Sequence, residues 1–272
     1  MIRADKNYNG VIEELVNGSW ISPSDNQQYG IPIKNIEIRE TLDGKETDLI
    51  KDLHSNQKLL VVSDPFTHKA MGSRIFKNLK GHLNVDEYIW ENPSSSIKGV
   101  EFLRSKLKDY DGMIAVGSGT VSDSIKYATF LEGKVYSVFA TTPMNAYTTG
   151  TASISFDGVK KSLVAHYAQG VFFDLEVLSN CPKRLTAAAF ADVICRTTAQ
   201  VDWLMSHKLL NTDYKTTPYE LLALYEMDMI NNASDIAAGK IDSLALLTLI
   251  SAIMGLGTSF TQTTHLGSMG EH

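Results

Sequence analysis

The protein has 272 residues, of which 43% are hydrophobic and 21% charged, enough for a large buried core and for two domains. Its net charge is −6, and its Lys and Arg residues form no run, which excludes the electrostatic footprint of a nucleic-acid-binding protein. Cys181 and Cys195 form no CxxC pair, and the N-terminus lacks the apolar stretch of a secretory signal. These features predict a cytoplasmic protein.

The first part of the chain predicts an α/β domain. Between Lys34 and Leu175, short β-branched runs alternate with helical patterns, which is typical of a mostly parallel sheet covered by helices. The predicted strands are 35–39, 58–63, 86–90, 112–116, 135–140 and 171–174. Between the last two, residues 152–164 alternate around Asp157-Gly158, which favours a tight hairpin turn. We therefore expect a Rossmann-like, cofactor-binding domain over residues 1–178.

The rest of the chain predicts a second, all-helical domain over residues 179–272. Ala, Leu and Met dominate after Pro182, a proline expected in the first turn of a helix. The longest apolar run, 244–256, contains Thr248 and Ser251 and is shorter than the roughly 20 residues that cross a bilayer. It predicts a buried core helix. We expect the two domains to pack closely, with a cleft between them, because no Gly/Ser-rich linker separates them.

The strongest local motif is the glycine loop, residues 117–123, with the sequence Gly-Ser-Gly-Thr-Val-Ser-Asp. It follows a predicted buried strand and begins a helix. Glycines let a pyrophosphate approach the backbone, and the free N–H groups and dipole of a helix start attract an anion. The usual third glycine is absent, with Asp123 near its place. Gly-x-Gly turns also serve close packing of a strand and a helix. The motif is therefore open to two interpretations, phosphate binding and packing alone.

Polar residues also follow two neighbouring strands. A Thr-rich segment, 141–150, follows strand 135–140 at the edge where ligands bind in open α/β sheets. Alternatively, its hydroxyls satisfy nearby backbone groups. Asp64 follows strand 58–63 and either caps the helix near Thr67 or contacts a ribose.

Taken in order, six segments resemble the glycerol-1-phosphate dehydrogenases of the iron-containing alcohol dehydrogenase and dehydroquinate synthase-like superfamily. The segments are Val62-Ser63-Asp64 with Thr67, Gly117 to Asp123, Thr142 to Thr149, Gly170 to Leu175, Ala191-Asp192, and Gly267 to His272. The resemblance runs almost from end to end, and the ordered series is far more specific than any one motif.

The resemblance implies NAD or NADP in the first domain and a divalent metal in the second, usually zinc, with iron or nickel as alternatives. It implies that Asp64 contacts the adenosine end of the cofactor and that Thr141, Thr142 and Thr149 contact the nicotinamide half. Gly119, Thr120, Val121, Ser122 and Asp123 would contact the pyrophosphate and the nearby cofactor, and Gly117 and Ser118 would also bind the cofactor. Asp192 and His272 would be catalytic metal ligands, and Asn145 and Asp192 would contact substrate. Asn145 stands where many members carry Asp, and Ala189 and Ala191 replace glycines.

The implied reaction is the metal-dependent interconversion of sn-glycerol 1-phosphate and dihydroxyacetone phosphate with NAD(P). The family places a further His and another metal ligand after the position of His272, so we expect the chain to stop partway through its catalytic domain and to self-associate. The alternatives are a glycerol dehydrogenase, a dehydroquinate synthase-like enzyme, and an inactive nucleotide-binding fragment. Expected partners are a small phosphorylated polyol or ketone and further copies of the chain, with no nucleic acid and no membrane span.

Overall fold

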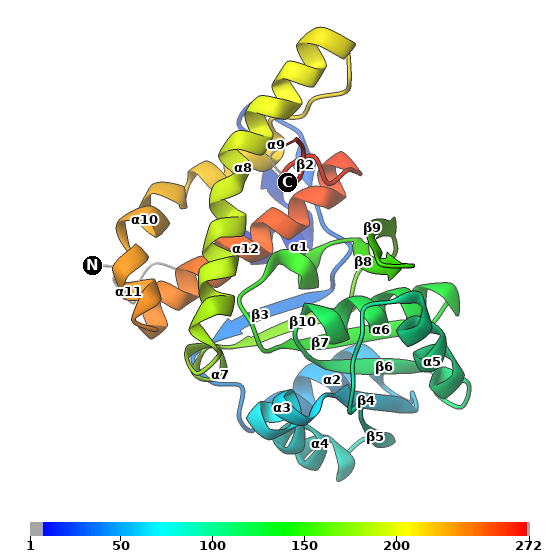
Figure 1. Cartoon of the computed structure of the whole chain (residues 1–272). Coiled ribbons are helices and arrows are strands. Elements are labelled where there is room, and N and C mark those ends of the chain that lie inside the picture. Colours follow the sequence, from blue (N-terminus) through cyan, green and yellow to red (C-terminus); the bar gives the residue numbers. More distant parts are fainter. Residues whose placement is uncertain (1–7, 271–272) are drawn as a thin grey trace. The chain divides into compact units, whose positions relative to one another are not determined.

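The computed structural model describes residues 8–270 and contains two compact units (Figure 1). The sheet unit consists of Ile33–Thr142 and Ala146–Leu178. The helical unit consists of the described residues up to Pro32, of Pro143–Asn145, and of Ser179 onward. The helical unit therefore includes two segments that precede Ser179 in the chain.

The sheet unit is built on six parallel strands in the order β3-β10-β7-β6-β4-β5. Their bounds are β3 (Asn35–Arg39), β4 (Leu59–Ser63), β5 (Val85–Ile89), β6 (Gly112–Gly117), β7 (Val135–Ala140) and β10 (Gly170–Asp174). These strands confirm the predicted parallel sheet, each within one residue at either end. β4, β6 and β10 are buried along their whole length, which explains why they are continuous apolar runs rather than alternating ones.

Helices cover the sheet. They are α2 (Glu46–His54), α3 (Pro65–Thr67), the π-helical turn η1 (His68–Gly72), α4 (Ser73–Lys80), α5 (Ile97–Leu107), α6 (Gly119–Leu131) and α7 (Leu175–Ser179). Alternate strand residues, such as Val61, Ile114 and Phe139, pack in one core with Ile50 of α2 and Ile75 of α4. α6 packs on β6 and β7, beside α5. The start of α6 is therefore held rigidly at the carboxyl end of β6.

The predicted hairpin is also present in the sheet unit. β8 (Thr151–Phe156) pairs antiparallel with β9 (Val159–Val164), and Asp157 and Gly158 have φ values of +48° and +84°. Two successive positive φ values are what a tight two-residue hairpin turn requires. Just before β8, the 3₁₀ turn η2 spans Asn145–Thr148.

The helical unit contains α1 (Tyr8–Asn17), α8 (Lys183–Leu210), α9 (Thr217–Ala223), α10 (Glu226–Asn231), α11 (Ala233–Ala237) and α12 (Ile241–Thr261), with a small ribbon of β1 (Trp20–Ile21) and β2 (Gln28–Tyr29). Among the described residues, α12 alone is long and apolar enough to cross a membrane. It is buried from Ser243 to Thr258, apart from the partly buried Ala245, which confirms the predicted core helix. Pro182 forms the N-cap of α8 with ψ of 126°, so its expected place in the first helical turn was wrong by one position.

Candidate functional site

The sheet has a topological switch point between β4 and β6. β5 lies on one side of β4, and β6, the next strand in the sequence, lies on the other side of β4. Asp64 follows β4, and the glycine loop follows β6. The Thr67 hydroxyl donates to the Val116 carbonyl across 2.9 Å and joins these two strand ends. In open α/β sheets, ligands bind at this place, outside the carboxyl ends of the strands.

The N-terminus of α6 is open to an anion. Ser118 is its N-cap, with extended backbone and, among the described residues, no side-chain hydrogen bond that caps the helix. The first N–H groups of a helix have no intrahelical acceptor. A Cβ built on Gly119 would find Ala146 Cβ as its nearest neighbour, 4.0 Å away. Gly119 therefore leaves a cradle of open space that suits a diphosphate, so the residues present fit a nicotinamide dinucleotide.

Gly117 has a different reason to be glycine. A Cβ built there would lie 2.8 Å from Cβ of Val121, closer than packed carbons come. Ser118, Gly119 and Thr120 are partly exposed, whereas Val121, Ser122 and Asp123 are buried. Packing thus explains Gly117, and the accessible stretch 118–120 is the part of the predicted loop best placed to touch a ligand.

Asp64 caps a helix, one of its two expected roles. Its Oδ1 accepts from the N–H groups of Phe66 and Thr67 at 2.8 and 3.0 Å, and the Thr67 hydroxyl accepts from the Asp64 N–H at 3.0 Å. This is a reciprocal capping box. A contact of Asp64 with the cofactor ribose stays a prediction.

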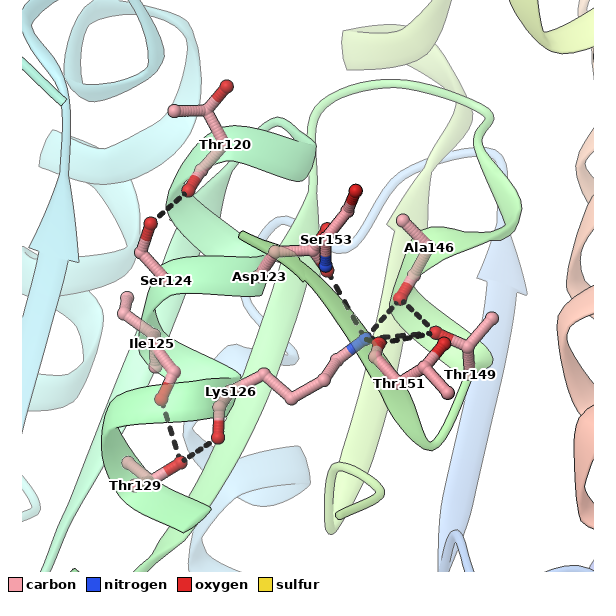
Figure 2. Close-up of polar contacts among 10 residues, drawn as sticks. All are labelled: Thr120, Asp123, Ser124, Ile125, Lys126, Thr129, Ala146, Thr149, Thr151 and Ser153. Carbon is pink, nitrogen blue, oxygen red and sulfur yellow. Dashed lines mark hydrogen bonds and ion pairs between the residues drawn. The ribbon is translucent and has the colours of Figure 1, made fainter. Parts of the chain in front are cut away.

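A buried lysine that sequence reasoning missed lies beside the glycine loop (Figure 2). The side chain of Lys126 is fully buried, and its Nζ contacts Asp123 Oδ1 at 3.3 Å. Burial lowers the pKa of Lys126 and raises that of Asp123, and their mutual attraction opposes both shifts. The Asp-x-x-Lys spacing on an apolar helix was the available signal, because it puts both side chains on one helix face.

The hydroxyls of the Thr-rich segment have partners inside the sheet unit. Tyr147 donates to the Gly117 carbonyl at 3.0 Å and lies 2.6 Å from the Thr142 hydroxyl. Burial raises the pKa of Tyr147, which keeps the phenol protonated as a donor. Thr149 Oγ1 accepts from Lys126 at 3.1 Å. Thr149 Oγ1 also donates to nearby backbone carbonyls, which confirms the alternative of local backbone hydrogen bonding for Thr149, whereas the partner of Thr142 is a side chain. Contacts of Thr141, Thr142 and Thr149 with nicotinamide stay predictions.

The helical unit brings Asn145 and Asp192 together. Asn145 Nδ2 donates to Asp192 Oδ2 at 2.7 Å. His272, the other predicted metal ligand, lies outside the described residues. Over residues 8–270 no group of three or more His, Cys, Asp or Glu side chains is placed to hold a metal ion. The described residues supply one carboxylate of the expected set, which is not a complete metal site.

Side chains near Asp192 on α8 serve packing. The Cys195 thiol donates to the Asp192 carbonyl at 3.0 Å, and Arg196 pairs with Glu226. Trp203 is buried, and its indole N–H donates to the Asp213 carbonyl at 2.7 Å. These residues stabilise the helical unit.

Comparisons with known proteins identify relatives of this chain. A family model described as iron-containing alcohol dehydrogenase matches residues 37–182. The glycerol-1-phosphate dehydrogenase (NAD(P)+) of Pyrococcus horikoshii is 29% identical over 242 residues, which cover 86% of this chain and 69% of that protein. The enzyme of the same name from Halalkalibacterium halodurans is 27% identical over 220 residues, covering 78% and 55%.

Solved structures show the same fold. An iron-containing alcohol dehydrogenase from Thermotoga maritima has a TM-score of 0.68 at 18% identity, covering 86% of this chain and 69% of that chain. A probable glycerol dehydrogenase from Sinorhizobium meliloti has a TM-score of 0.66 at 17% identity, covering 83% and 65%. The chain thus spans from about half to about two thirds of the length of such relatives. Since the family model matches just over half of its residues, the chain belongs to the iron-containing alcohol dehydrogenase family.

Proposed function

We propose that this chain carries the cofactor-binding part of an NAD(P)-dependent oxidoreductase that interconverts sn-glycerol 1-phosphate and dihydroxyacetone phosphate. The observation that carries the proposal is the open start of α6 at the switch point, where Gly119 leaves room for a diphosphate. The names of the curated relatives support the choice of substrate pair. Family membership supports the reaction type.

The chain's own residues suit the binding of a dinucleotide. The N–H groups at the start of α6 point to the place where a diphosphate would bind, and the helix dipole adds a favourable field. When bound, the nicotinamide ring supplies hydride acceptance from an alcohol and hydride donation to a ketone. Asn145 and Asp192 offer an adjacent amide and carboxylate, groups that hydrogen-bond the hydroxyls of a polyol.

A metal requirement is part of the proposal. Asp192 and His272 are its candidate ligands, with zinc expected first and iron or nickel as alternatives. Asp192 lies within the described residues, and His272 lies outside them. We also propose a cytoplasmic location and a homo-oligomeric state.

The test is oxidation of NADH and NADPH by dihydroxyacetone phosphate, with added zinc and with chelator. It uses this chain and any longer product that its gene encodes. We expect dihydroxyacetone phosphate to oxidise the nucleotide and chelator to abolish this reaction. Unphosphorylated dihydroxyacetone should be a poor substrate. Equal turnover of both ketones would exclude the phosphorylated substrate. Nucleotide binding without turnover in both proteins would favour the binding-module alternative.

A further inference from the structure

The ammonium group of Lys126 holds one short stretch of chain at both ends. Nζ donates to the Ala146 carbonyl at 2.6 Å and to the Thr151 carbonyl at 2.9 Å, and it contacts Thr149 Oγ1 at 3.1 Å (Figure 2). Thr149 Oγ1 itself lies 3.1 Å from the Ala146 carbonyl and 2.9 Å from the Thr151 carbonyl. Residues 146–151, called here the lysine-held segment, are thus closed into a loop around one cation.

Asp123 fixes the same arrangement from the other side. Its Oδ1 faces Lys126 Nζ, and its Oδ2 accepts from the Ser153 N–H at 3.1 Å. Burying an ion pair costs several kcal/mol unless further hydrogen bonds satisfy both partners, as they do here. Such a group orders its surroundings, because any movement of the segment would leave a buried charge with fewer partners.

The lysine-held segment borders the cofactor cradle. Ala146, whose carbonyl Lys126 binds, is also the nearest neighbour of a Cβ built on Gly119, at 4.0 Å. The segment follows β7, whereas Asp64 follows β4, and these strands flank β6 on opposite sides. A dinucleotide whose diphosphate lies over β6 therefore has one half on each side, and the segment borders the half that lies over β7.

We propose that Lys126 and Asp123 are positioning residues that hold the lysine-held segment, which contains the predicted nicotinamide contact Thr149, against the half of the cofactor that lies over β7. The inference rests on the proposed function, since it needs a dinucleotide at this edge. It also gives Asp123 a different role from the predicted pyrophosphate contact, because both of its carboxylate oxygens are engaged within the sheet unit.

The test compares NADH, whose nicotinamide half would reach the lysine-held segment, with ADP, which lacks that half. The double variant Asp123→Asn/Lys126→Met removes both charges together, which avoids a buried unpaired charge. NADH binding is measured by fluorescence and ADP binding by calorimetry, with circular dichroism and melting temperature as controls for folding. We expect NADH to bind about tenfold more weakly and ADP to keep its affinity within about twofold.

Lys134 offers a matched control. Its Nζ also donates to backbone carbonyls, those of Leu107 at 2.7 Å and Tyr110 at 2.6 Å, but it precedes β7 at the other end of the strand. Lys134→Met should lower stability without changing NADH affinity. Unchanged NADH affinity in the double variant, or an equal loss for NADH and ADP, would overturn the inference.

Hydrogen exchange separates failure of this inference from failure of the proposed function. If the unaltered chain binds neither nucleotide, the proposed function is wrong. The positioning role is then judged by the amides of residues 146–153, which should exchange faster in the double variant and not in Lys134→Met. Equal exchange in both variants would reject the positioning role.

Discussion

The amide of Asn145 donates to the carboxylate of Asp192 across 2.7 Å, joining residues 47 positions apart within the helical unit. A neutral donor at this place stabilises the ionised carboxylate. An aspartate there, as the family resemblance leads one to expect, would put two carboxylates in contact. The departure from the family pattern thus has a structural consequence in this chain.

The first prediction concerns Asn145. Asn145→Asp should lower the free energy of unfolding at pH 7 by about 2 kcal/mol, because like charges meet. Asn145→Ala should cost about 1 kcal/mol, the value of the lost hydrogen bond. Urea unfolding of both variants measures the difference. Equal stability of Asn145→Asp and the unaltered chain would contradict the observed contact.

The second prediction concerns the cradle at Gly119. Gly119→Ala should weaken NADH binding about tenfold, because the new methyl group occupies the space that a diphosphate needs. Stability should not fall, since the methyl group meets no close neighbour. Gly81→Ala is the matched control. Gly81 also has open space around its Cβ position, and it follows α4, outside the glycine loop. Similar NADH affinity in both variants would exclude Gly119 from the site.

The third prediction concerns Gly117. Gly117→Ala should destabilise the sheet unit by about 1–3 kcal/mol through overpacking against Val121. Thermal unfolding of Gly117→Ala, Val121→Gly and Gly117→Ala/Val121→Gly tests the cause, because only glycine at position 121 removes the Cβ that meets the new methyl group. The double variant should lose less stability than the sum of the two single changes. Simple additivity would show that the strain does not come from Val121.

The fourth prediction concerns pH. Burial and the nearby Lys126 lower the pKa of His166 from 6.5 to about 4, and its Nε2 pairs with Thr129 Oγ1 at 2.9 Å. Between these two pH values the unfolded chain binds a proton at His166 that the folded chain does not, so stability is full above pH 6.5 and falls as the pH drops toward 4. Because solvent reaches part of the ring, the loss should be on the order of 1–2 kcal/mol. His166→Gln should flatten this part of the stability profile, measured by urea unfolding across the range.

The fifth prediction concerns an apolar stripe on α8. Val201, Met205 and Leu209 are 64%, 52% and 74% exposed, and their spacing of four residues places them on one helix face. We expect the 272-residue chain to self-associate through this stripe in a concentration-dependent way. Val201→Glu/Met205→Lys should reduce the association on a sizing column. A monodisperse monomer before substitution would refute the prediction.

Much of the fold followed from local patterns. Short apolar runs such as 59–63 and 112–117 are typical of strands in a parallel sheet that is covered on both faces. The positions of these strands could therefore be predicted from the sequence. Asp157-Gly158 predicted its turn because it readily adopts two successive positive φ values. The glycine loop was likewise recognisable, because a strand, a glycine turn and a helix are contiguous in sequence.

Tertiary structure decided the roles of individual side chains. Whether Gly117 serves packing and Gly119 leaves space depends on which atoms lie opposite each Cα, and these come from Val121 and Ala146. Local sequence marked Lys126 as a helix residue, but its burial depends on carbonyls 20 and 25 positions away. Pairing of Asn145 with Asp192 likewise arises when a loop meets a distant helix. Sequence alone determines the elements, because backbone propensity and hydrophobic period are local, whereas hydrogen-bond partners and open space arise when the elements pack.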